Sequence, residues 1–272
     1  MDWLYGRQVV RLAFAGGAKR RPRRLVATPE GAAWLAGHGV AGATHGVAGA
    51  AATLGVAGAG AAQGVELERV ESRELQQLTG SHEHQGVACL VGDYPYVAPG
   101  ALLACDLLVV LDEVTDPRNL GAIARSALGA GAGGLALPRH RSAAVTPAAV
   151  KASAGATEHL DIAHVTNVAG FLAECQQAGH WVYGAAGDAG RPYDALDLSG
   201  KVVLVFGAEG RGLRPLVRRA CDELAAIPMQ GPVDSLNVSV AAALFLYEVR
   251  RQGRALTAAR PPGREPGLRG GA

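Results

Sequence analysis

The sequence predicts an α/β fold built on a mostly parallel sheet and preceded by a smaller α/β domain. Between residues 105 and 252, apolar runs that suit buried strands alternate with helical patterns. This alternation is typical of a parallel sheet covered by helices on both faces. The turn-rich stretch 94–100 separates this region from the first hundred residues. We therefore divide the chain into a small domain over 1–98, a linker over 99–104, the large domain over 105–252, and a disordered tail rich in Arg, Pro and Gly over 253–272.

In the small domain, residues 66–78 predict a strand followed by a short amphipathic helix, and residues 87–91 predict a short buried strand. Residues 39–64 are almost all Gly, Ala and Val and contain the pentad GVAGA three times. The pentads are too short for solenoid units. We interpret the stretch as a low-complexity insertion or a loosely packed helix and assign it no function. In the large domain the predicted strands are the apolar runs 107–111, 134–137, 160–165, 181–183, 202–206 and 224–227.

The net charge of +2 is too small to indicate nucleic-acid binding, but the charges are unevenly distributed. The first thirty residues contain only two acidic residues, Asp2 and Glu30. Their basic residues are Arg7, Arg11, Lys19, Arg20, Arg21, Arg23 and Arg24. Such a cluster can pair with phosphates, or it can be a solvated basic loop. An Arg-rich start also allows an organelle transit peptide, although it lacks a signal-peptide pattern.

The four cysteines lie far apart and form no CxxC pair. They predict neither a zinc site nor a disulfide framework, and reduced thiols fit a cytoplasmic protein. No apolar run reaches the roughly 18 residues that a membrane span needs. We therefore expect no metal and no membrane partner.

The first motif that contains candidate catalytic residues follows the predicted strand at 107–111. Asp116 can cap a helix and Pro117 suits its first position. A core-facing stripe then recurs with helical spacing at Leu120, Ile123, Ala124, Ala127 and Leu128. Asn119 and Arg125 lie off this stripe, which places Asn119 at the mouth beyond the strand and Arg125 on the polar flank. Taken alone, the pattern also fits a capped helix with an exposed arginine.

The second motif follows the strand at 202–206, where Gly207, Gly210 and Gly212 bracket Glu209 and Arg211. Glycines permit positive φ angles and let a ligand approach the backbone. No GK[ST] follows and the GxGxxG spacing is missing, so neither a Walker A loop nor a dinucleotide site is indicated. A plain strand–turn–helix is the alternative.

The third motif, at 226–243, follows the last predicted strand. Two prolines and a glycine hold a loop open, and Ser235 or Asn237 could cap the alanine-rich helix that follows. The small side chains of that helix permit close packing. An ordinary capped helix explains each residue singly, but not why two successive strand ends pair glycines with polar side chains.

The stretches DPRNLGAIARSA (116–127), VFGAEGRGL (205–213) and IPMQGPVDSLNVSVAAA (227–243) resemble, in order, the signature motifs of the SpoU branch of the SPOUT RNA methyltransferases. The resemblance covers the whole large domain. The small domain resembles the ribosomal-protein-like RNA-binding domain that often precedes it, through 6–7, 75–78 and 84–87, while 39–64 departs from that pattern. The resemblance implies a C-terminal trefoil knot, a homodimer with its sites at or across the interface, and S-adenosylmethionine as methyl donor.

The same resemblance implies 2'-O-methylation of a ribose in RNA. The cofactor would be held by residues at or near the knot loops, namely Gly207, Ile227, Leu236, Ala185 and Met229. Hydrogen bonds that position the reacting groups would come from Asn119, Glu209, Ser235 and Asn237. Arg125 is the family's proposed activator of the 2'-OH. A guanidinium pKa above about 12 makes it a poor base, so we expect Arg125 to stay charged, bind an adjacent phosphate and stabilise the developing alkoxide. Deprotonation helped by that phosphate is the alternative.

The acceptor is the open question. The third motif is closest in wording to bacterial enzymes that methylate a guanosine of 23S rRNA. The alternatives are a tRNA guanosine 2'-O-methyltransferase and, less favoured, a resistance methyltransferase for 23S adenosine. A non-catalytic RNA-binding protein is disfavoured because all five polar motif residues are present. A Rossmann oxidoreductase is disfavoured because GxGxxG and an acidic ribose anchor are missing.

Overall fold

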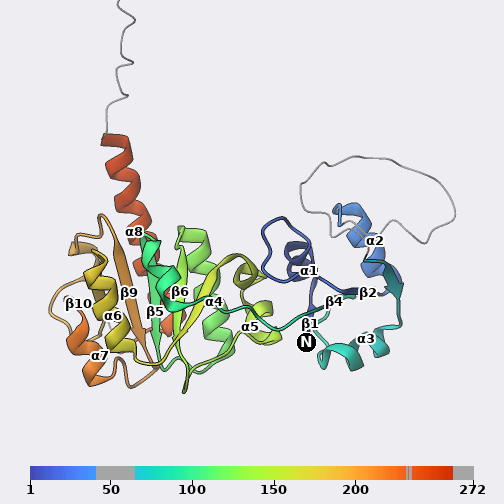
Figure 1. Ribbon diagram of the computed structural model, residues 1–272, viewed down its shortest axis with the longest axis horizontal. Helices are drawn as coiled ribbons and strands as arrows, with labels where there is room; N and C mark the ends of the chain where they lie inside the picture. The colour runs from blue at the N-terminus through green and yellow to red at the C-terminus, as the bar shows by residue number, and fades with distance from the viewer. Residues whose placement is uncertain (41–64, 231, 233–234, 260–272) are drawn as a thin grey trace, which may run out of the picture.

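The computed structural model describes residues 1–40, 65–230, 232 and 235–259, with side chains up to Gly253 (Figure 1). The large domain contains a sheet of six strands, all paired in parallel. Their order is β10-β8-β9-β5-β6-β7. The strands are β5 Leu107–Asp112, β6 Gly134–Pro138, β7 Asp161–Val165, β8 Trp181–Ala185, β9 Val202–Gly207 and β10 Glu223–Ala225. Each overlaps a predicted strand, so the predicted α/β fold is confirmed.

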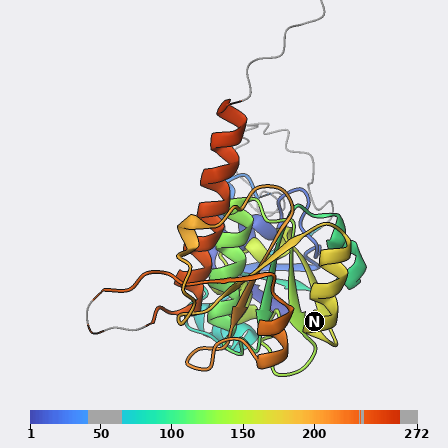
Figure 2. The ribbon, with the colours of Figure 1, turned by 90° about the vertical axis from the view of Figure 1, so that its left-hand side faces the viewer.

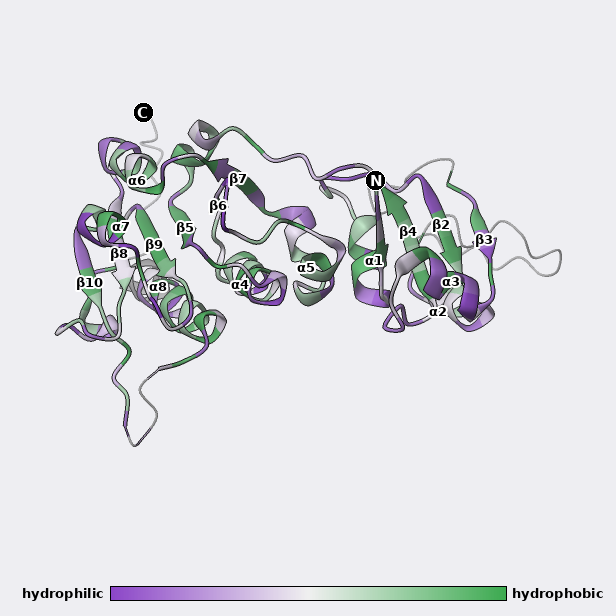
Figure 3. Cartoon of the chain, turned by 90° about the horizontal axis from the view of Figure 1, so that it is seen from below, coloured by the Kyte–Doolittle hydropathy of each residue, from purple (hydrophilic) through white to green (hydrophobic). Residues whose placement is uncertain are grey.

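Helices cover both faces of this sheet (Figure 2 and Figure 3). On one face, alternate residues such as Leu108 and Val203 pack against α6 Val168–Gln177 and α7 Pro215–Ala220. On the other face, Val109 and Leu204 join the core that includes α4 Pro117–Ala130, α5 Pro147–Ala152 and α8 Val238–Ala259. Strands buried on both faces explain why the sequence shows continuous apolar runs rather than alternation.

The chain order changes direction at β5, which lies between β9 and β6. In open parallel sheets, ligands bind beyond the carboxyl ends of the strands at such a switch point. The strands β10, β8, β9 and β5 are neighbours in the sheet, so their carboxyl ends lie next to one another along one edge. The three motifs follow β5, β9 and β10, so the topology brings them to one edge.

The small domain contains a second sheet of order β1-β4-β2-β3. Its elements are β1 Asp2–Tyr5, α1 Arg7–Ala13, β2 Arg24–Ala27, α2 Pro29–Gly37, β3 Leu67–Arg69, α3 Ser72–Thr79 and β4 Val87–Val91. The predicted strand–helix pair over 66–78 and the strand at 87–91 are confirmed. Most of the Gly/Ala-rich stretch, residues 41–64, lies outside the described residues.

The two domains are joined through a buried ion-pair network. Arg20, only 3% exposed, contacts the fully buried Glu158 of the large domain at 2.6 and 3.0 Å and Asp2 at 2.9 Å. Lys19 pairs with Asp161, and the Tyr94 hydroxyl donates to backbone carbonyls of the large domain. Arg24 pairs with Glu68. Part of the basic cluster near the start of the chain therefore holds the protein together, and Arg20 is not available to a phosphate.

Two predicted boundaries are wrong. Residues 99–104, predicted as a linker, form the 3-10 helix η1 Pro99–Ala104, whose Leu102 is fully buried in the core of the large domain. The predicted tail from residue 253 begins inside α8, which continues to Ala259. Alanine and arginine favour helix strongly enough to extend it past Gly253. Residues 260–272 lie outside the described part of the chain.

We expect the small domain to lose stability as the pH falls from 7 to 5. His84 is buried, and its Nδ1 accepts a hydrogen bond from the Gly86 amide at 3.0 Å. Burial, followed by the charges of His82 and Lys151, lowers the pKa of His84 below its ordinary 6.5. The unfolded chain then binds the proton more readily, so protonation favours unfolding below about pH 6.5. Thermal unfolding of His84→Asn, which keeps an acceptor oxygen, should depend less on pH in this window. An identical pH dependence in the two proteins would contradict the assignment.

Candidate active site

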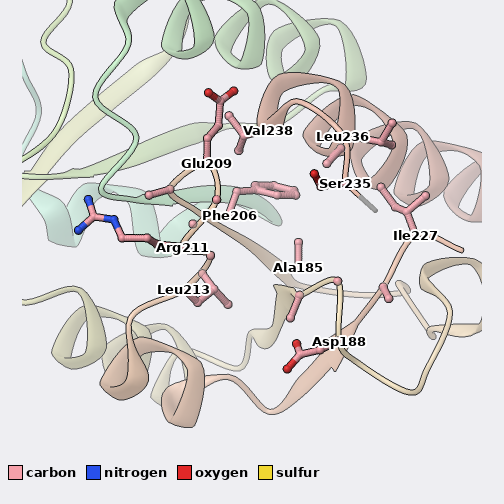
Figure 4. Close-up of a pocket in the computed structure, with 18 of the residues that line it drawn as sticks. Ala185, Asp188, Phe206, Glu209, Arg211, Leu213, Ile227, Ser235, Leu236 and Val238 are labelled. Carbon is pink, nitrogen blue, oxygen red and sulfur yellow. The ribbon is translucent and has the colours of Figure 1, made fainter. Parts of the chain in front are cut away.

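A cavity of about 390 Å³ lies beyond the carboxyl ends of β8, β9 and β10 (Figure 4). Its wall comes from Ala185 at the end of β8, from the loop after β9, from Ile227 after β10, and from the start of α8. Most of these groups are apolar, with a few polar side chains among them, which is the usual character of a small-molecule site.

The loop after β9 depends on a close backbone contact at Gly207. The amide of Ala208 donates to the Gly212 carbonyl at 3.1 Å, and the reverse bond measures 2.8 Å. A Cβ on Gly207 would lie 2.1 Å from the Gly212 carbonyl carbon. Gly210 and Gly212 adopt φ angles of 76° and 65°, which side-chain-bearing residues rarely adopt. The glycines of the second motif therefore fold this loop and keep the cavity open.

Three polar side chains from the three motifs form one hydrogen-bond network. The Asn237 amide donates to Glu209 Oε1 at 2.6 Å and to Asn119 Oδ1 at 3.1 Å. The Asn119 amide donates to the same Glu209 oxygen at 3.0 Å. Asn237 also caps α8, because its Oδ1 accepts from the Ser239 amide at 2.8 Å. Helix α4, the β9 loop and helix α8 are thereby fixed to one another at the mouth of the cavity.

The end of β5 carries a second polar group that the sequence analysis did not identify. Asp112 is fully buried and accepts from the Arg214 backbone amide at 2.9 Å and from its Nε at 2.7 Å. This pair holds the start of α7 to the strand end, and the hydrogen bond to Asp112 is the main reason that the pKa of Arg214 is raised. An Asp–Glu pair directly after a fully apolar strand was the signal that could have identified it.

The structure brings most of the predicted site residues together. All five predicted cofactor residues line the cavity, as do Glu209 and Ser235. Asn119 and Asn237 reach it through their hydrogen bonds to Glu209. Arg125 does not join them in this chain: it is exposed on α4, as predicted, and its side chain makes no ion pair with any residue that the structure describes. Asp188 and Arg218, which no sequence motif indicated, form an ion pair of 2.8 Å at the cavity wall.

Within residues 1–40, 65–230, 232 and 235–259, no three His, Cys, Asp or Glu side chains come together as metal ligands would. None of the helices in the described part of the chain combines the length and apolarity that a membrane crossing requires.

This parallel sheet, with a cavity beyond the ends of β8, β9 and β10, has the architecture of small-molecule-binding α/β proteins, and sequence comparison gives the family. Residues 106–247, just over half of the chain, match the SpoU rRNA Methylase family, and residues 54–97 match the domain described as RNA 2'-O ribose methyltransferase substrate binding. The chain belongs to the SpoU rRNA methylase family.

Relatives and solved structures agree with this assignment. A Mycobacterium ulcerans protein named as an uncharacterized tRNA/rRNA methyltransferase is 43% identical over 197 residues, which cover 70% of this chain and 64% of the relative. The chain thus spans less than two thirds of that relative's length. The AdoMet-bound rRNA methyltransferase of Sinorhizobium meliloti has a TM-score of 0.68 at 27% identity, covering 92% of this chain and 87% of the other. A putative TrmH-family RNA methyltransferase of Porphyromonas gingivalis has a TM-score of 0.67 at 26% identity, covering 92% and 90%.

Proposed function

We propose that this protein transfers the methyl group of S-adenosylmethionine to a ribose 2'-OH in RNA. The observation that carries the proposal is the cavity lined by Glu209, whose carboxylate accepts hydrogen bonds from Asn119 and Asn237 of the other two family motifs. The match of residues 54–97 to a 2'-O ribose methyltransferase substrate-binding domain supports RNA ribose as the acceptor. The Sinorhizobium meliloti structure, named as AdoMet-bound, supports the cofactor.

The cavity fits such a cofactor by its size and by the chemistry of its wall. Its volume lies in the range of small-molecule sites. The apolar side chains of Ile227, Leu236 and Met229 suit the faces of an adenine, and backbone groups near Gly207 and Ala185 suit its polar edges and the ribose. When bound, the cofactor supplies an electrophilic sulfonium methyl group.

The residues of the chain then have to orient the acceptor hydroxyl and stabilise the negative charge that develops on its oxygen as the proton leaves. The amides of Asn119 and Asn237 both donate to Oε1 of Glu209 and hold that carboxylate in one position. Arg125 binds a phosphate next to the acceptor and stabilises the alkoxide as it forms. Fixing the groups before the reaction reduces the entropy lost on reaching the in-line geometry.

The proposal includes a homodimer in which Arg125 serves the partner's cavity. Val240, Leu244 and Tyr247 are 47%, 37% and 53% exposed and recur with helical spacing on α8, forming an apolar face. A Cβ on Gly129 of α4 would lie 3.2 Å from the Tyr247 hydroxyl oxygen. Arg125 lies one helical turn before Gly129, so it borders this face. A second subunit packed there would bring Arg125 beside another cavity.

We also infer that the β9 loop and the segment after β10 form a trefoil knot, which is supported by their joint lining of the cavity.

We further propose a guanosine of 23S rRNA as the acceptor and the cytoplasm as the location. The test is incubation of the purified protein with labelled S-adenosylmethionine and, separately, 23S rRNA and tRNA, followed by mapping of 2'-O-methyl sites. Label mapped to the ribose of a guanosine in 23S rRNA supports the proposed acceptor. Label in tRNA alone would replace the acceptor, and label in neither RNA would contradict the enzymatic function.

We expect Glu209→Ala to weaken S-adenosylmethionine binding about tenfold, a change of about 1.4 kcal/mol. The substitution removes the acceptor of two amide donors, so both asparagines lose their fixed positions at the cavity mouth. Glu209→Gln, which keeps an oxygen able to accept both bonds, should bind the cofactor with nearly wild-type affinity. Titration calorimetry measures the effect. Equal losses in the two variants would mean that the charge, rather than the hydrogen-bond geometry, matters.

A further inference from the structure

Three arginines from two loops, Arg141 after β6 and Arg211 and Arg214 after β9, surround one buried carboxylate beside the cavity. Glu113, which directly follows β5, is only 8% exposed. Its Oε1 lies 3.4 Å from Arg141 of the β6 loop and 3.8 Å from Arg214, and its Oε2 lies 3.9 Å from Arg211 of the glycine loop. Within this group, three guanidinium groups face the two carboxylates of Asp112 and Glu113, so one positive charge remains.

The backbone that supports this cluster is unusual. Glu113 and Arg141 both adopt left-handed conformations, with φ angles of 61° and 57°. Such positions cost free energy for residues other than glycine and tend to persist at functional sites. The Ala143 amide donates to the Val114 carbonyl at 2.9 Å, which ties the two loops together. The loops therefore present Arg141 from a fixed base next to the glycine loop.

The pairing of Arg141 and Arg211 with Glu113 leaves most of their donors unused. A charged N–H···O bond usually measures 2.7–2.9 Å, and the Nε of Arg214 donates to Asp112 Oδ1 at 2.7 Å. The contacts of Arg141 and Arg211 are longer, and their side chains are 79% and 80% exposed. Figure 4 shows Arg211 pointing away from the hollow between Ala185 and Ile227. It is thus directed to the outer rim of the cavity rather than to a cofactor inside it.

We propose that Arg141 and Arg211 form a clamp for an RNA phosphate close to the methylated ribose. This inference rests on the proposed function, which brings a phosphodiester chain to this rim. Guanidinium groups bind phosphate oxygens through paired N–H donors. Glu113 holds the two arginines at one place without saturating their donors, and the remaining positive charge attracts the backbone.

The test measures binding of end-labelled 23S rRNA, with tRNA in a parallel series, over a range of salt concentrations. The Arg141→Ala/Arg211→Ala double variant should lower the slope of log affinity against log salt by about 0.7 to 1.8, as expected for one or two lost phosphate contacts. Its affinity for S-adenosylmethionine should stay within about twofold of wild type. Because both side chains are largely exposed, its melting temperature should not change.

Two controls make the result specific. Arg191→Ala removes another exposed arginine, which pairs with Glu223 at 2.6 Å on the edge strand β10, and should leave the slope unchanged. Arg141→Lys/Arg211→Lys keeps the charges but loses the forked donors, so it should keep the slope and bind RNA more weakly than wild type. An unchanged slope in the double alanine variant would overturn the clamp. Loss of cofactor affinity there would reassign the arginines to the cofactor. Absence of methyl transfer by the wild-type protein would instead count against the proposed function, since binding is measured without it.

Discussion

Replacing Gly207 with alanine is expected to abolish measurable S-adenosylmethionine binding, with an affinity loss of at least about 100-fold, or about 2.7 kcal/mol. The added methyl group would lie 2.1 Å from the carbonyl carbon of Gly212 and 2.4 Å from the amide nitrogen of Leu213. Both are backbone atoms, so no side chain can rotate away. The loop must therefore open. Because this loop forms part of the cavity wall and carries Glu209, the wall changes shape and Glu209 moves. Titration calorimetry with the purified variant measures the loss.

Gly187 provides the matched control for this substitution. It lines the same cavity, but a Cβ there would meet no atom within 4 Å. Gly187→Ala should therefore bind the cofactor within about twofold of wild type. If Gly207→Ala also retains near-normal affinity, the loop after β9 is not part of the cofactor site.

The parallel sheet could be predicted from sequence because its strands are buried on both faces. The central strands β5 and β9 appear as uninterrupted apolar runs over 107–111 and 202–206, and the glycines and polar residues that follow β9 and β10 mark the strand ends. The cavity-lining roles of Gly207, Ile227 and Leu236 came from the family resemblance. Spacing alone left a plain strand–turn–helix as an alternative.

Other features depend on contacts between distant segments. Arg20 looked like part of a basic surface cluster, yet it lies in an ion pair with Glu158, which is 138 residues away. The roles of Glu113 and Arg141 rest on left-handed backbone angles that glutamate and arginine rarely adopt, so their residue types do not predict them. Strands β1 and β2, of four residues each, were not predicted.

Arg125→Ala is expected to lower the rate of methyl transfer by about 100- to 1,000-fold, the effect of removing one donor that stabilises a developing oxyanion. Cofactor affinity and melting temperature should be unchanged, because Arg125 is exposed and does not line its own chain's cavity. Arg125→Lys should recover part of the rate, since a positive charge is restored without the forked geometry. Single-turnover transfer and calorimetry separate the two quantities. Equal loss of transfer and cofactor binding would make Arg125 a structural residue.

Mixing two inactive variants tests whether Arg125 acts on the partner's cavity. In a mixture of Arg125→Ala and Gly207→Ala subunits, half of the dimers contain one of each if subunits pair at random. Such a dimer has one cavity with intact Gly207 that faces the intact Arg125 of the other subunit, so about a quarter of the wild-type activity should return, as the symmetry of a two-fold interface requires. If Arg125 served the cavity of its own chain, every cavity in the mixed dimer would lack one of the two residues and no activity would return.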